Sequence, residues 1–340
     1  MRSIAIVGLL CVATGSAAIA TACSSFGDAE PALADAATSE AAASDAEPPS
    51  PDAPVSVDAA ACVLATSPTL VAPTTSAPTR LGTNGASLFW IEGGTRIVRA
   101  SVTDCSTTEV ATGNISALAV DSEWVVWGDD TYKALRRSEV GTGVVPKTDG
   151  ASIPGSLLLA GGTAFWIDAA NQHVAECATP CTSTTVAAQL GSPTLLAANA
   201  TRFFVFGVDA DSGTAGALFW QALGVGPLIG PIFSASPEPV LLAANDLRVF
   251  WVASNGSVTG LPSGGGMPIT FDTVSGAEAL AVDSSFVYVA TSTQIQRAPV
   301  AGGAWTPIVT GETAITSLLV TTDAVVWATP LAVRRIRKPT

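Results

Sequence analysis

One ten-residue phrase recurs along the chain at a nearly constant interval, and this repetition limits the fold more than any other feature. Two apolar stretches flank a short polar turn in each copy, as in "LAVDSEWVVW" (118–127) and "LAVDSSFVYV" (280–289). The second stretch ends on an anchor residue, and the seven anchors are Trp90, Trp127, Trp166, Val205, Trp251, Val289 and Trp327. The intervals between them are 37, 39, 39, 46, 38 and 38 residues. Seven similar segments at one period indicate a repeat architecture, in which every unit presents the same apolar surfaces to its neighbours.

Each copy contains four short strands separated by turn residues. The phrase supplies two strands, and a third strand often carries arginine, as at Arg99, Arg137, Arg297 and Arg335. A turn rich in Gly or Pro often comes next, such as "PSGGG" (262–266), and a fourth strand such as "TPIVT" (306–310) follows. This pattern is typical of antiparallel β-structure. A helical repeat is not expected, because no 3.6-residue periodicity occurs outside the first 22 residues.

A period near 40 residues with four strands per copy predicts the blades of a β-propeller. The first strand of each copy is small and apolar, which suits the crowded centre of a ring. The bulky anchor lies on the second strand, where it can wedge between neighbouring blades and bury a large area. We therefore predict an all-β, seven-bladed propeller over residues 59–340. A six-bladed ring is the alternative if the fourth copy is degenerate, since that copy lacks the Trp and has an insert near residues 208–216.

The two ends of the chain are expected to close the ring. The last copy stops after its third strand, and "ACVLATS" (61–67) precedes the first copy and resembles other fourth strands. Pairing this segment with the last copy near Val333 would remove the free sheet edges.

The segments "LFWIE", "VVWGDD", "AFWID" and "VFWVAS" resemble the Tyr-Trp-Thr-Asp (YWTD) type of propeller repeat, and also NHL-type and related bacterial repeats. The resemblance covers residues 60–340 and implies a fold rather than one activity, because propellers host many functions. The Asp of the pattern is present only in some copies, at Asp129 and Asp168, so an Asp-based contact between blades is implied only there.

The N-terminus resembles the export signal of bacterial lipoproteins. Arg2 precedes an apolar run (4–22) that ends in small residues before Cys23, which is the pattern of a signal peptide. The resemblance implies a signal peptide over 1–22, lipid attachment at Cys23 and, from Ser24, an outer-membrane location. The chain has Ala20 where the family prefers Leu. An ordinary signal peptide with a chance cysteine and an uncleaved membrane anchor are the alternatives.

The segment 23–58 is predicted to be a disordered tether. Residues 28–58 contain eight acidic side chains and no basic one, and the surrounding sequence is mostly Ala, Ser and Pro. Such a segment cannot bury enough apolar surface to offset the entropy lost on ordering. From residue 59 onward the net charge is only -6, and this mild acidity argues against a nucleic-acid partner.

Four cysteines remain after the first 23 residues, and an exported protein can form disulfides. Cys177 and Cys181 flank a short turn, so we expect them to pair. Cys62 and Cys105 then pair by elimination, which would tie the closing strand to the first blade.

Residues suited to catalysis or metal binding are sparse. His173 is the sole histidine and is expected on the surface rather than as a general base. Asp209 and Asp211 are weak candidates for a Ca²⁺ site, with a polar hairpin tip as the alternative. No catalytic residue, firm metal site or cofactor is therefore assigned.

Two further groups of residues have a structural and a binding interpretation. The cations of "RRIRKP" (334–339) are expected on a solvated strand and tail, with contact to anionic lipid or envelope polymer as the alternative. Trp124, Trp220 and Trp305 lie outside the anchor position. They are expected to pack between blades, although an exposed aromatic could stack on a sugar.

These features favour a non-catalytic, lipid-anchored propeller of the cell envelope that binds a protein or polysaccharide partner. The alternative is an exported enzyme of lyase or hydrolase type with its site at the central channel. An enzyme requires convergent polar groups in a concave pocket, whereas a scaffold requires an accessible binding surface.

Overall fold

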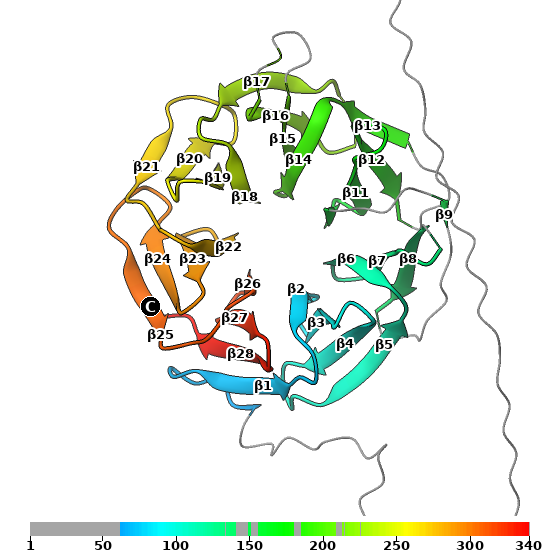
Figure 1. Cartoon of the computed structure of the whole chain (residues 1–340), viewed down its shortest axis with the longest axis vertical. Helices are drawn as coiled ribbons and strands as arrows, with labels where there is room; N and C mark the ends of the chain where they lie inside the picture. Colours follow the sequence, from blue (N-terminus) through cyan, green and yellow to red (C-terminus); the bar gives the residue numbers. More distant parts are fainter. Residues whose placement is uncertain are drawn as a thin grey trace, which may run out of the picture. The chain divides into compact units, whose positions relative to one another are not determined.

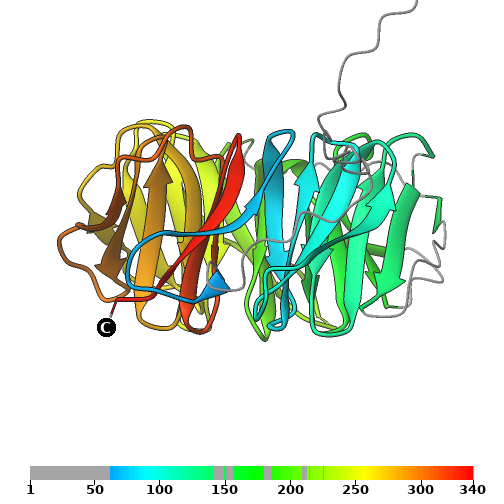
Figure 2. The same ribbon diagram turned by 90° about the horizontal axis from the view of Figure 1, so that it is seen from below.

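The structure is a computed structural model that describes residues 62–132, 134–140, 149–150, 156–179, 185–208, 213, 215–224 and 226–339. From Cys62 onward the chain forms a ring of seven sheets around a central channel, and each sheet is four antiparallel strands (Figure 1). The prediction of a seven-bladed all-β propeller is therefore confirmed. The side view shows the strands of each blade running across the thickness of the ring (Figure 2). No helix among the described residues is long and apolar enough to cross a membrane.

Blades 1 to 4 follow the repeat in chain order, with the first strand of each copy innermost. Blade 1 comprises β2 (Pro78–Thr83), β3 (Ser87–Glu92), β4 (Arg96–Ser101) and β5 (Thr107–Thr112). Blade 2 comprises β6 (Ile115–Val120), β7 (Trp124–Asp129), β8 (Ala134–Glu139) and β9 (Asp149–Gly150). Blade 3 comprises β10 (Leu157–Ala160), β11 (Thr163–Asp168), β12 (His173–Ala178) and β13 (Thr185–Gln189). Blade 4 comprises β14 (Gly191–Ala198), β15 (Arg202–Val208), β16 (Ala217–Ala222) and β17 (Ile229–Ser234). The fourth copy is thus a complete blade, and the six-bladed alternative is wrong.

Blades 5 to 7 complete the ring. Blade 5 comprises β18 (Pro239–Ala244), β19 (Arg248–Ala253), β20 (Val258–Pro262) and β21 (Ile269–Phe271). Blade 6 comprises β22 (Ala277–Val282), β23 (Phe286–Thr291), β24 (Gln294–Pro299) and β25 (Thr306–Thr310). Blade 7 comprises β26 (Ser317–Val320), β27 (Ala324–Thr329), β28 (Ala332–Arg337) and, as its outermost strand, β1 (Thr69–Pro73). We call the interface between blade 7 and blade 1 the seam.

The recurring phrase produces a recurring strand register. Leu118 lies opposite Trp127, and the same first-strand position lies opposite the anchor in blades 3 to 7. The innermost strands of neighbouring blades lie close to one another around the centre of the ring (Figure 1). A Cβ atom on Gly82 would lie 2.8 Å from Cγ2 of Val120 on the next innermost strand. Small first-strand residues are therefore needed there, as the sequence predicted.

The anchors fill the interfaces between blades. All five anchor tryptophans are at most 2% exposed. Trp90 packs against blade 7, whereas the preceding residue, Phe89, packs against blade 2. The buried apolar residues form seven clusters, one at each interface between adjacent blades. Burying a Trp or Phe in such a cluster contributes about 3 kcal/mol per side chain, so every interface between blades contributes to the stability of the ring.

The ring closes with a strand from each end of the chain, but the closing strand differs from the predicted one. The pairing partner of β28 is β1 rather than residues 61–67, with Thr69 opposite Arg335 and Ala72 opposite Val333. Residues 62–68 run irregularly beside the end of β28, where Ala65 O accepts a hydrogen bond from Arg337 N at 2.7 Å. At the start of this segment, Cys62 is bonded to Cys105 of blade 1.

Candidate functional site

The central channel is lined by the innermost strands, which are predominantly apolar. Among the described residues of these seven strands, the titratable side chains are Arg80 and Glu278, which lie on blades 1 and 6. No group of three or more His, Cys, Asp or Glu side chains that could hold a metal ion occurs in the described part of the chain. The described channel wall therefore brings together no set of convergent catalytic groups.

Acidic residues occupy a repeated position two residues after the anchor in blades 1 to 3, and all three are buried. These residues are Glu92, Asp129 and Asp168. Asp129 is 1% exposed, and its Oδ2 lies 3.0 Å from Nε of Arg136. Asp168 accepts hydrogen bonds from the backbone N and side-chain Nδ2 of Asn171. In blades 2 and 3 these carboxylates therefore bind groups of their own blade.

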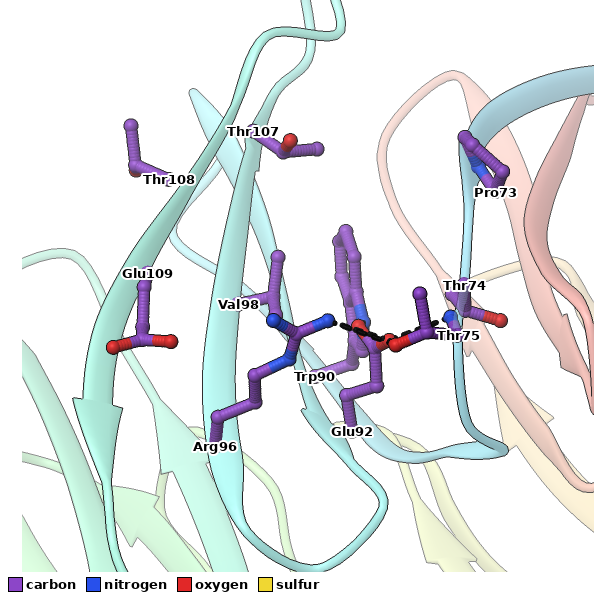
Figure 3. A pocket seen from close by; sticks show the side chains of 10 residues that line it. All are labelled: Pro73, Thr74, Thr75, Trp90, Glu92, Arg96, Val98, Thr107, Thr108 and Glu109. Atoms are coloured by element: carbon purple, nitrogen blue, oxygen red, sulfur yellow. Dashed lines mark hydrogen bonds and ion pairs between the residues drawn. The ribbon is translucent and has the colours of Figure 1, made fainter. Parts of the chain in front are cut away.

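Blade 1 differs, because its acid lies in a cleft that opens on the perimeter of the ring. We call this the outer seam cleft (Figure 3). It has a volume of about 260 Å³ and lies between the end of β1 and the strands β3, β4 and β5. Its lining residues are Pro73, Thr74, Thr75, Trp90, Glu92, Arg96, Val98, Thr107, Thr108 and Glu109. All of these residues lie between positions 73 and 109, and Pro73 is the last residue of the closing strand β1.

Glu92 is buried in the outer seam cleft and accepts several hydrogen bonds. Its Oε1 accepts hydrogen bonds from the backbone N and Oγ1 of Thr75, both at 2.8 Å, and from Nη2 of Arg96 at 2.9 Å. Nε1 of Trp90 donates to the other carboxylate oxygen at 3.5 Å. Burial raises the pKa of Glu92, but the hydrogen bonds from Arg96 and Thr75 outweigh it and hold that pKa below its ordinary value. Glu92 is therefore an anionic hydrogen-bond acceptor near neutral pH rather than an acid.

Several other polar groups of the outer seam cleft face solvent, although Thr74 is buried. The Arg96 side chain is 39% exposed, and Nη2 is the nitrogen that contacts Glu92 and Thr75. Glu109 and Thr108 are exposed on β5, across the cleft from Thr75. The cleft thus combines an apolar wall of Pro73, Trp90 and Val98 with donors and acceptors held at fixed positions.

The predicted disulfide across the seam is confirmed. Cys62 and Cys105 are bonded, with their Cα atoms 5.5 Å apart, and both are buried. The bond ties the segment before β1 to the turn between β4 and β5. Cys177 is also disulfide-bonded, and its expected partner Cys181 lies outside the described residues. Cys23, the segments 1–22 and 23–58, and the weak metal candidates Asp209 and Asp211 lie outside them as well.

The expectation of solvated C-terminal cations is met at Arg337, which is exposed, but it is wrong for Arg335, which is buried, and both Arg334 and Lys338 form ion pairs. Arg335 is 5% exposed and donates from Nη1 to Val102 O at 2.9 Å and from Nη2 to Cys62 O. Arg334 forms a two-pronged ion pair with Glu312 at 2.8 and 3.0 Å. Lys338 pairs with Asp283 of blade 6 at 2.8 Å. Arg335 contacts the turn between β4 and β5 of blade 1, so its burial depends on residues that lie far away in the sequence.

The side chain of His173 is less exposed than expected, at 13%, and its Nε2 lies 3.8 Å from Oδ2 of Asp168.

The tryptophans outside the anchor position are confirmed as packing residues. Trp124 and Trp220 lie under Arg137 and Arg202, with guanidinium-to-ring distances of 4.6 and 4.0 Å. Trp305 packs on Phe271.

Sequence reasoning missed the outer seam cleft entirely. Its one sequence signal is the acid at Glu92, which falls on the same repeat position as Asp129 and Asp168. That signal does not separate a carboxylate at a cleft from a buried one, because the cleft arises from the arrangement of β1 against blade 1.

No family model matches the sequence, and no curated protein matches it. Solved structures do match. The WD40 β-propeller domain of Doa1 has a TM-score of 0.62 at 11% identity, covering 81% of this chain and 98% of that one. The computationally designed Ika8 protein has a TM-score of 0.58 at 13% identity, covering 79% and 98%. The gluconolactonase XC5397 from Xanthomonas campestris has a TM-score of 0.50 at 12% identity, covering 80% and 89%. At these identities the similarity shows a β-propeller fold and nothing of function.

Proposed function

We propose that this protein is a non-catalytic, lipid-anchored propeller of the bacterial envelope that binds a polysaccharide in its outer seam cleft. The observation that carries the proposal is the chemistry of that cleft. Its polar groups are a fixed Arg96–Glu92 pair and several threonine hydroxyls, set beside an apolar wall. Binding sites of this kind combine an apolar lining with a few placed polar groups that set orientation.

A sugar ring suits this combination better than an apolar ligand does. Its hydroxyls both donate and accept hydrogen bonds, so they can pair with Arg96, Glu109 and the threonines. Its C–H faces can pack against Pro73 and the edge of Trp90. The cleft opens at the perimeter of the ring, so a long polymer can pass along the outside with one or two units inside.

The envelope location rests on the N-terminal sequence. The charged residue, apolar run and Cys23 of that segment are the features of an exported lipoprotein, and the acidic tether would hold the ring away from the bilayer.

The test is binding of the full-length protein, in detergent, to an array of envelope polysaccharides that includes peptidoglycan fragments and lipopolysaccharide. The cleft variants are Arg96→Gln and Glu109→Gln. Glu123→Gln, an exposed residue of blade 2, is the control. We expect the unchanged protein and the control to bind one class of glycan, and each cleft variant to bind it roughly tenfold less tightly.

Two results would overturn the proposal. Equal binding by all variants, or binding to none of the glycans, would remove the cleft as the site. Shortened fragments released from the bound glycan would instead identify an exported enzyme.

A further inference from the structure

The seam contains a second cavity, on the face that carries the turns between first and second strands. It has a volume of about 310 Å³, and residues from both ends of the chain line it. Leu64, Leu88, Val102 and Val326 provide apolar walls, while Asp323 and Arg335 provide opposite charges. We call it the turn-face cavity. It shares no lining residue with the outer seam cleft, so it is independent of the proposed function.

Arg335 is an unusual lining residue, because its guanidinium is buried without a carboxylate bound to it. The residue is 5% exposed, and its described hydrogen-bond partners are the carbonyls of Val102 and Cys62 and the sulfur of Cys62. Its buried Nε has no hydrogen-bond partner in the described structure. A buried charge with an unmade hydrogen bond is costly, and a bound anion would reduce that cost. Burial lowers the pKa of Arg335, and the charge of Asp323 opposes this effect.

Asp323 carries the opposite charge to Arg335 and, unlike Arg335, is exposed. It lies in the turn between β26 and β27, and its carboxylate makes no hydrogen bond or ion pair with the described residues. The turn is held in place by its backbone, since Asp323 O accepts a hydrogen bond from Lys338 N at 2.8 Å. The cavity therefore has an open negative charge, a buried positive charge and apolar walls.

From this arrangement we propose that the turn-face cavity binds a small zwitterion, namely an α-amino acid with an apolar side chain. The carboxylate of the ligand would approach Arg335, and its ammonium group would approach Asp323. Its side chain would pack on Leu88 and Val326. A polyanion is disfavoured because Asp323 repels it, and a bare metal ion is disfavoured because the walls are apolar.

The test is calorimetric titration of the full-length protein with L-leucine. Acetate, which lacks the ammonium group and the side chain, serves as one probe, and isopentylamine and leucine amide, which lack the carboxylate, serve as two others. We expect binding of leucine, with each of the three probes at least roughly tenfold weaker. Failure of leucine and other apolar amino acids to bind at about 10 mM would overturn the proposal, as would acetate binding as tightly as leucine.

The decisive variant is Asp323→Asn, because this exposed turn residue can be changed without disturbing the core. Glu123→Gln is its matched control, since Glu123 occupies the same turn position in blade 2. We expect the Asp323 variant to bind leucine roughly tenfold more weakly and the control to bind it normally. Arg335→Lys is a second probe, whose folding must be checked because Arg335 also holds Cys62. Unchanged leucine binding by the Asp323 variant would contradict the proposal.

Discussion

Thr69 pairs with Arg335 across 266 positions of the sequence, and its Oγ1 donates a hydrogen bond to Arg335 O at 3.2 Å. This contact belongs to the only sheet of the described ring that combines strands from the two ends of the chain. Both cavities discussed above lie at the seam that this pairing creates. The stability of the seam therefore determines whether either cavity exists.

The disulfide at the seam should make a large contribution to stability. Changing both Cys62 and Cys105 to Ala is expected to lower the free energy of unfolding by about 3–4 kcal/mol, because the bond closes a loop of 43 residues in the unfolded chain. The measurement is urea denaturation of the full-length protein. Equal stability of the variant and the unchanged protein would show that the seam holds without the bond.

The anchors should be among the most sensitive positions of the ring. Trp327 is fully buried, so Trp327→Ala is expected to cost about 3–5 kcal/mol. Trp327→Phe should cost much less, because Nε1 of Trp327 has no hydrogen-bond partner in the described structure. Trp305→Ala, at a half-buried position, is the control, and a cost there as large as at Trp327 would contradict the packing argument.

Consecutive blades are joined by amide side chains on the turn face. Nδ2 of Asn199 donates to Asn245 O at 3.0 Å, and Nδ2 of Asn245 donates to Asp283 O at 2.6 Å. Oδ1 of Asn245 also caps its own turn by accepting from Leu247 N and Arg248 N.

Two substitutions of Asn245 separate these roles. Asn245→Asp keeps the cap but loses the donor, and Asn245→Ala loses both. We expect destabilisation of about 1 kcal/mol for Asp and about 2 kcal/mol for Ala, measured by thermal and urea unfolding. If the Asp variant were as stable as the unchanged protein, the contact between blades would contribute nothing.

Protonation of Asp283 at low pH should lower the free energy of unfolding of the ring. Burial raises the pKa of this carboxyl, but hydrogen bonds from Lys338, Ser285 and Phe286 hold it below its ordinary value. A folded-state pKa below the unfolded one gives stability that is fully present above the unfolded pKa, near 4. That stability is lost as the pH falls through the folded pKa.

Unfolding free energies from pH 7 down to about pH 3 test this expectation. Asp283→Asn should be less stable at neutral pH and should lose less stability on acidification than the unchanged protein does. Glu123→Gln serves as the exposed control. Parallel pH curves for the unchanged protein and the Asp283 variant would exclude the contribution.

The sequence predicted the features that depend on local repetition, and it missed those that depend on the seam. The anchor period determines the blade number, because each blade repeats the same packing between Trp or Val anchors and the preceding blade. The closing strand was misplaced by several residues, since its position depends on how Cys62 reaches Cys105. The buried state of Arg335 could not be predicted either, because its partners, the carbonyls of Cys62 and Val102, lie more than 200 positions away in the sequence.

The most direct test of the closed ring is residue-resolved amide hydrogen exchange of the full-length protein. Closure predicts that the amides of Thr69 and Ala72 in β1 and of their partners Arg335 and Val333 in β28 are protected to the same extent. Reduction of the disulfide should then lower the protection of both strands together. Rapid exchange of β1 beside a protected β28 would contradict closure of the ring by the two ends of the chain.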